Sequence, residues 1–190
     1  NVYNISDNGK VTQSPVETWK KCVQIISELC LKLPGLENRT LVVSITGQGD
    51  GTWLVDGDDE PTCDAWLWMD SRSAKIAKNL ASLPTEEARF KATGTGMFAG
   101  QQSSQMAFIE SFSPNILDKS ETAFHCKDYL YMKLTDIRAT DPSEACMSFG
   151  NFRTRNYDDE VIKNIGLQKR RSLLPEIIDG SKVTYPLSDN

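Results

Sequence analysis

A glycine-rich loop early in the chain places the strongest constraint on the fold. Residues 47–51, Gly-Gln-Gly-Asp-Gly, separate an apolar run at residues 41–45 from a second β-prone run at residues 52–56. A dinucleotide-binding loop has the spacing G-x-G-x-x-G and opens a helix, whose N-terminus holds the pyrophosphate. Here the spacing is G-x-G-x-G and the chain re-enters a strand, which disfavours a nucleotide-dependent oxidoreductase. We expect close backbone approach at the glycines and a polar loop tip, where the Gln48 amide and the Asp50 carboxylate suit ligand hydroxyls.

Length and charge narrow the class of protein. The chain has 190 residues, 39% of them hydrophobic and 25% charged, which fits one soluble globular domain. Its net charge of -5 argues against a nucleic-acid partner, since such proteins carry a basic face. The one dense basic run, residues 169–171, is expected to be a solvated helix end. No apolar run is long enough for a membrane span.

The cysteine and histidine content argues against metal or disulfide chemistry. Five cysteines, an odd number with no C-x-x-C pair, favour reduced thiols and a cytoplasmic location. The single histidine, His125, leaves too few ligands for zinc and cannot anchor a convincing Ser-His-Asp triad. We expect His125 to be a helix-entry residue, and we expect no metal site.

The remaining patterns predict an α/β fold. Asn8-Gly9 between β-prone runs predicts a hairpin over residues 1–11. Ser14 and Pro15 predict the cap and first turn of a helix that ends before Pro34-Gly35, with one apolar stripe buried. Strands are expected at residues 41–45, 52–56 and 65–69. Helices are expected at residues 73–80, 85–91, 102–110, 125–134 and 158–165, with a capped helical segment after residues 140–142.

Two tryptophans mark the third predicted strand. Because side chains alternate along a strand, Trp66 and Trp68 share one face and Leu67 takes the other. Each tryptophan alone is most simply explained by core packing. Trp68, however, stands beside Asp70 and Arg72 at the strand end, where open α/β sheets bind ligands. A flat indole next to hydrogen-bonding groups suits the C–H face of a sugar or polyol.

These segments together resemble a known family. The segments Thr46-Gly47-Gln48-Gly49-Asp50-Gly51 and Trp66-Leu67-Trp68-Met69-Asp70-Ser71-Arg72 resemble the two signature segments in the amino-terminal domain of FGGY carbohydrate kinases. That family includes glycerol, xylulose, ribulose, gluconate and erythritol kinases. Residues 150–157 look most like the erythritol-kinase-like branch. Further similar segments follow in the family's order: Glu17 with Trp19, residues 127–130, 134–135, 140–145, 166–167 and 174–176.

The resemblance implies a fold and a reaction. The implied fold is a ribonuclease-H-like (actin-like ATPase) α/β domain, a mixed sheet flanked by helices, incomplete at both ends in residues 1–190. The implied reaction transfers the γ-phosphoryl group of ATP, with Mg²⁺, to a hydroxyl of a polyol or sugar such as erythritol or xylulose. A small sugar or polyol is the expected partner, with neither nucleic acid nor membrane. The oligomeric state stays open, with a homodimer as one option for the full-length enzyme.

The family's substrate site can be carried over position by position. Gly49 and Asp50 fall where glycerol kinases carry an Arg-Glu pair that holds glycerol. Asp50 can still accept hydrogen bonds from hydroxyls, whereas Gly49 offers only backbone and room, so glycerol itself is in doubt. Trp68 falls on a tryptophan that contacts glycerol. Gln101 and Gln102 fall in a loop where glycerol kinases present a substrate-contacting tyrosine.

The remaining assignments concern bracing and missing parts. Gln48 completes the expected substrate-binding set, and Asp70 and Arg72 are expected to brace the site. By the resemblance, the phosphate loop, the catalytic aspartate and the nucleotide-binding carboxy-terminal domain all lie outside this chain. We therefore expect the 190 residues alone to be inactive and to bind neither ATP nor Mg²⁺. The alternative from a different class is a non-catalytic sugar-binding module that uses the same loop.

Overall fold

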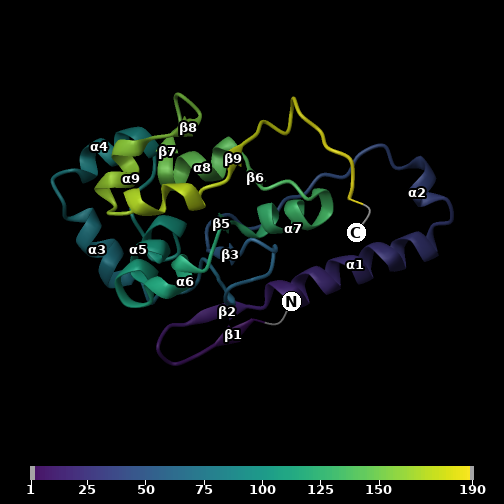
Figure 1. Ribbon diagram of the computed structural model, residues 1–190, viewed down its shortest axis with the longest axis horizontal. Coiled ribbons are helices and arrows are strands. Elements are labelled where there is room, and N and C mark those ends of the chain that lie inside the picture. Colours follow the sequence, from purple (N-terminus) through teal and green to yellow (C-terminus); the bar gives the residue numbers. More distant parts are fainter. Residues whose placement is uncertain (1–2, 189–190) are drawn as a thin grey trace.

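Short strands at the centre, with helices on either side, make up the computed structural model, which describes residues 3–188 (Figure 1). The strands are β1 (Asn4–Ile5), β2 (Val11–Gln13), β3 (Trp53–Val55), β4 (Ala65–Trp66), β5 (Thr122–Phe124), β6 (Ala139–Thr140), β7 (Gly150–Asn151), β8 (Asn156–Tyr157) and β9 (Glu176–Ile177). The helices are α1 (Pro15–Lys32), α2 (Leu36–Arg39), α3 (Ala74–Ala81), α4 (Glu86–Thr93), α5 (Gln102–Phe112), α6 (Pro114–Asp118), α7 (Cys126–Thr135), α8 (Pro142–Phe149) and α9 (Asp159–Asn164). A 3₁₀ helix covers Gln168–Leu173.

The strands pair mostly in antiparallel fashion. They form the sheet β1-β2-β4 and the pairs β3-β5, β6-β9 and β7-β8, of which β6-β9 is parallel. An antiparallel bridge between Thr52 and Trp66 joins the first sheet to the β3-β5 pair. The predicted hairpin is confirmed as β1 and β2, with Gly9 at a φ of 81° in the turn. Val2, which that prediction included, lies outside the described residues.

Two apolar clusters lie on opposite sides of β3 and β4. Leu54 and Trp66 pack with α5, α8 and α9, through residues such as Met106 and Phe149. On the other side the core contains Val11, Trp53, Val55, Ala65, Leu67, Phe124, Tyr129 and Met132. Trp66 and Leu67 therefore lie on opposite faces as predicted, but β4 ends at Trp66, so Trp68 lies beyond the strand and outside the cluster that contains Trp66. Because β4 is packed on both faces, its position is fixed, and so is the starting point of the loop that follows it.

Helix α1 begins as predicted but leaves its apolar stripe exposed. The Ser14 hydroxyl accepts a hydrogen bond from the Glu17 N–H, and Pro15 takes the first turn. The carboxy-terminal part of the helix projects from the rest of the molecule together with α2 (Figure 1). Ile26 is 44% exposed and Leu33 43% exposed. Our prediction that the whole stripe is buried was wrong: among the described residues Trp19 packs against the second cluster, whereas Ile26 and Leu33 stay exposed.

The strand predicted at residues 41–45 is also absent from the described structure. These residues have no regular secondary structure, and Leu41, Val42 and Val43 are exposed. A strand exists only with a partner for its backbone groups, and no described strand lies beside this segment. We call the exposed stripe of α1 together with residues 41–43 the apolar face.

The prediction for the basic run at residues 169–171 needs correction. Arg170 is not part of a solvated helix end, because it forms ion pairs at 2.7 Å with both Glu110 and Asp118. The five cysteines carry free thiols. Within residues 3–188, no helix combines the length and the apolar character that crossing a membrane requires.

Candidate functional site

Three backbone segments meet at the end of β4 and form the frame of the site. The Gly51 N–H donates to the Gly100 carbonyl at 3.0 Å, and the Thr52 N–H donates to the Trp66 carbonyl at 2.8 Å. A side chain at Gly100 would overlap the Trp68 carbonyl, so this close approach requires glycine. The glycine loop, the β4 exit and the loop before α5 are thereby held against one another.

An open hollow of about 480 Å³ lies in this frame. Its lining residues are Gln48, Gly49, Asp50, Trp68 and Phe98. The Trp68 indole N–H donates a hydrogen bond to the Gln48 side-chain oxygen at 2.9 Å, and the indole stays 45% exposed. The hollow therefore combines two exposed aromatic rings with a carboxylate. Four of its five residues were predicted, but Phe98 was missed, because an aromatic residue between glycines carries no signal of its own.

Asp50 is held in a conformation that few side chains adopt. Its φ is 60°, in the left-handed region. The carboxylate oxygen Oδ1 is buried and has no hydrogen-bond partner among the described residues. Burial and, to a lesser extent, the nearby Glu144 charge raise the pKa of Asp50 to about 6, while the His125 charge and a backbone hydrogen bond from Gln102 oppose the rise. A carboxylate with one unpaired oxygen, in a residue that lines a hollow, is suited to accept hydrogen bonds from a ligand.

The predicted bracing pair lies behind the hollow. Asp70 is fully buried and accepts hydrogen bonds from the Val11 N–H at 2.8 Å and from the Arg72 guanidinium at 2.7 Å. The Arg72 guanidinium also stacks on the Trp66 ring, 3.3 Å from its centroid. The pair joins β2 to the end of β4, two residues from Trp68. Neither side chain lines the hollow.

Gln101 and Gln102 lie below the surface of the hollow. The Gln101 amide donates to the Met147 carbonyl at 2.9 Å, and the Gln102 amide donates to the Phe124 carbonyl at 2.8 Å. Both side chains are buried. Gln102 is nevertheless connected to the site, because its backbone N–H, at the start of α5, hydrogen-bonds the Asp50 carboxylate.

A network of charged side chains from α7 and α8 lies beneath the glycine loop, and sequence reasoning missed its role. His125 Nδ1 lies 3.2 Å from Asp128, and His125 Nε2 lies 3.6 Å from Glu144. Lys127 pairs with Asp128 and with Asp141. The prediction that His125 is a helix-entry residue is confirmed, since it caps α7. The carboxylate of Glu144 reaches the loop, where it accepts a hydrogen bond from the Asp50 N–H at 3.4 Å.

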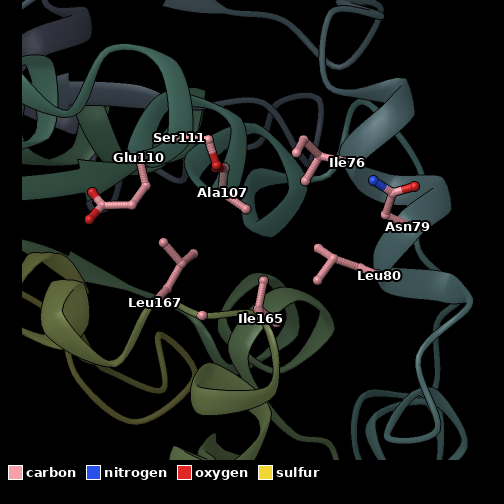
Figure 2. Close-up of a pocket in the computed structure, with 9 residues that line it drawn as sticks. Ile76, Asn79, Leu80, Ala107, Glu110, Ser111, Ile165 and Leu167 are labelled. Carbon is pink, nitrogen blue, oxygen red and sulfur yellow. The ribbon is translucent and has the colours of Figure 1, made fainter.

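A second hollow, of about 220 Å³, lies between α3, α5 and residues 165–167 (Figure 2). Its walls are mainly apolar, with Ile76 and Leu80 on one side and Ile165 and Leu167 on the other. Its one carboxylate, Glu110, is already paired with Arg170. Among the described residues, none of those lining it has a buried polar atom without a partner, so we assign the functional site to the first hollow.

The described residues offer neither a metal site nor a phosphate cradle. Residues 3–188 contain no group of three His, Cys, Asp or Glu side chains arranged to hold a metal ion. The glycine loop leads into β3 and not into a helix, so it lacks the N-terminal amides that bind phosphate.

Comparisons with known proteins agree with this geometry. Residues 1–189 match the model of the FGGY family of carbohydrate kinases, N-terminal domain. The chain is 56% identical over 188 residues to an erythritol kinase of Brucella abortus (strain 2308), covering 99% of this chain and 36% of that protein. A xylulose kinase of Rhodospirillum rubrum superposes with a TM-score of 0.90 at 18% identity, over 99% of this chain and 39% of that one. A xyloylose kinase of Brucella ovis gives 0.89 at 23% identity, over 99% and 38%.

The fold is thus that of the actin-like, ribonuclease-H-like domains. The chain belongs to the FGGY family of carbohydrate kinases and corresponds to their amino-terminal domain. It spans about a third of the length of the relatives it matches, 36% of the Brucella abortus protein.

Proposed function

We propose that the chain is the substrate-binding part of an ATP-dependent polyol kinase, with erythritol as the preferred substrate. The observation that carries the proposal is the hollow itself, which is lined both by Asp50, whose Oδ1 has no partner among the described residues, and by the exposed Trp68 indole. The 56% identity to an erythritol kinase supports the choice of erythritol.

Each lining residue has a chemical role in this proposal. The Asp50 carboxylate accepts hydrogen bonds from substrate hydroxyls, and such charged bonds are the strong ones. The Trp68 and Phe98 rings cover the C–H surface of the polyol. Gln48 fixes the indole through its side-chain oxygen, and its NH₂ group is free to donate to a further hydroxyl.

The charge of the hollow favours an uncharged substrate. Its lining contains one carboxylate and no lysine or arginine. A second carboxylate, Glu144, lies directly behind Asp50. A sugar acid such as gluconate would bring a like charge to these groups, so neutral polyols should bind better.

The parts that perform phosphoryl transfer belong, in this proposal, to the remainder of the full-length protein. ATP and Mg²⁺ would bind there, and the hydroxyl-deprotonating carboxylate would come from there. The present residues bind and orient the acceptor and shield it from water. The free thiols fit a reducing, cytoplasmic compartment.

A phosphorylation screen of the full-length protein tests the proposal. Erythritol, xylulose, ribulose, glycerol and gluconate are offered with ATP and Mg²⁺, and kcat/KM is compared. We expect the highest value for erythritol and the lowest for gluconate. Polyol binding with no phosphate transfer would favour the non-catalytic sugar-binding module, and neither binding nor transfer would contradict both.

A further inference from the structure

The charged network beneath the glycine loop is not explained by the fold alone. Asp128 and His125 are almost fully buried, with 3% of each residue exposed. Burying ionisable groups is costly unless they are paired. Most groups in the network are paired, yet the His125 Nε2 atom is buried with no hydrogen-bond partner among the described residues. That atom is directed at Glu144, 3.6 Å away.

Glu144 reaches the hollow because residue 49 is glycine. A side-chain Cβ at Gly49 would lie 2.6 Å from Glu144 Oε1, well inside contact distance. The carboxylate therefore occupies the space beside the Gly49 backbone that a side chain would otherwise need. From there Oε2 accepts the Asp50 N–H at 3.4 Å.

We propose that Glu144, oriented by His125, is a positioning residue that holds Asp50 ready for the substrate. This inference rests on the proposed function of the hollow. Asp50 has a left-handed φ of 60°, which costs free energy in an isolated loop. The Glu144 hydrogen bond on one side and the Gln102 N–H on the other fix this conformation. The Asp50 oxygen Oδ1 is then left free to meet a hydroxyl.

The same pair also controls the charge on Asp50. His125 and Glu144 are the charged side chains that act on Asp50, with opposite signs. His125 itself faces Asp128, Glu144 and Lys127. Burial lowers the pKa of His125, but its contacts with Asp128 and the charge of Glu144 outweigh burial and raise it. The raised pKa means that His125 keeps its proton to higher pH than a free histidine does, close to the carboxylates of Asp128 and Glu144.

The test uses the full-length protein and the dissociation constant of erythritol, measured by calorimetry between pH 5 and pH 8. An ionised Asp50 accepts hydroxyl protons better, so wild-type affinity should rise as pH increases through about 6. In Glu144→Gln the midpoint of this rise should move to lower pH, because a neighbouring negative charge is lost. In His125→Gln it should move to higher pH, because a positive charge is lost.

A matched control separates these effects from general disturbance. Glu160→Gln makes the same chemical change on α9, where the carboxylate is 75% exposed and distant from the hollow, and it should leave the midpoint unchanged. A purely structural role for Glu144 and His125 would not shift the midpoint in opposite directions. Two shifts of the same sign, or no shift in either variant, would overturn the inference.

A measurement without substrate distinguishes failure of this inference from failure of the proposed function. Hydrogen exchange of a peptide covering residues 46–52 is compared between wild type and Glu144→Ala. Faster exchange in the variant supports positioning even if the wild type binds no polyol, in which case only the proposed function fails. Equal exchange in both proteins would overturn the positioning role.

Discussion

The indole N–H of Trp68 donates a hydrogen bond to the side-chain oxygen of Gln48 at 2.9 Å, and this contact ties the end of β4 to the glycine loop. The two residues are 20 positions apart in the sequence, yet both line the same hollow. The bond orients the ring, so that one aromatic face is presented to the hollow before any substrate arrives. Such preorganisation lowers the entropy that binding must overcome.

Trp68→Ala should weaken polyol binding in the full-length protein. Aromatic contact surface and the fixed ring are both lost, so we expect KM for erythritol to rise by about tenfold or more, equivalent to about 1.4 kcal/mol. Gln48→Ala keeps the ring but frees it, and its KM should rise less, by about two- to tenfold. Steady-state kinetics measures both. Phe112→Ala, which removes another exposed aromatic ring away from the hollow, is the control and should leave KM unchanged.

Asp50→Asn should stabilise the protein at neutral pH. The pKa of Asp50 is about 6 in the folded protein and about 3.9 in the unfolded chain, so the native state binds more protons between these values. Native stability therefore falls as pH rises from about 4 to about 6. The asparagine variant escapes this loss and also tolerates the left-handed φ.

Thermal unfolding at several pH values measures this effect. The melting temperature of Asp50→Asn should match the wild type near pH 4 and exceed it at pH 7. Asp58→Asn, at an exposed turn, is the matched control and should show no such trend. A melting temperature below that of the wild type at pH 7 would mean that Asp50 is a stabilising residue and not one held ready for a ligand.

Gly100→Ala should destabilise the frame of the site. The new methyl group would overlap the Trp68 carbonyl, and relieving that overlap should cost about 1–3 kcal/mol of unfolding free energy. Gly96→Ala is the matched control, because an added Cβ there meets no atom within 4 Å. Denaturant unfolding of the two variants should differ clearly, and equal stabilities would show that the close approach is not a constraint.

Arg72→Met should reduce stability much more than substrate affinity. It leaves the fully buried Asp70 carboxylate without its main partner, and breaking such a pair costs about 3–5 kcal/mol. Because neither residue lines the hollow, the protein that remains folded should bind erythritol with nearly unchanged KM. A large rise in KM at a temperature where the variant is fully folded would instead place Arg72 in contact with the substrate.

The apolar face should be covered in the full-length protein. It comprises the exposed stripe of α1 and residues 41–43, with Leu41 98% and Val42 70% exposed. The matched region makes up only 36% of the Brucella abortus erythritol kinase. We therefore expect further residues of the full-length protein to pack against this exposed apolar surface. Hydrogen exchange of residues 41–45 in the full-length protein should be slow. Exchange at the rate of an unstructured peptide would contradict the expectation.

Local signals predicted much of the fold. Ser14 and Pro15 determine the start of α1 through backbone geometry and capping, and Asn8-Gly9 determines a hairpin. These effects involve neighbours in the sequence, so one sequence reveals them. The strand predicted at residues 41–45 was wrong because a strand depends on a partner elsewhere in the chain, which the local sequence does not reveal.

The candidate site also contains some residues that local sequence signals identified and others that depend on contacts between distant parts of the chain. Gln48, Asp50 and Trp68 could be selected because each lies near the end of a predicted strand and carries the right chemistry. Gln101 and Gln102 had the right chemistry, but their side chains are buried against the Met147 and Phe124 carbonyls. The link from His125 to Glu144 joins two helices, and no spacing in the sequence encodes it.

The most direct test of the central claim compares two Michaelis constants in full-length Asp50→Ala. If the hollow binds the polyol, KM for erythritol should rise by about 10- to 100-fold, as expected for losing a charged hydrogen bond of about 1.5–3 kcal/mol. KM for ATP should stay within about twofold of the wild-type value, because Asp50 lies in no phosphate-binding element. An equal rise in both constants, or an unchanged constant for erythritol, would contradict the account.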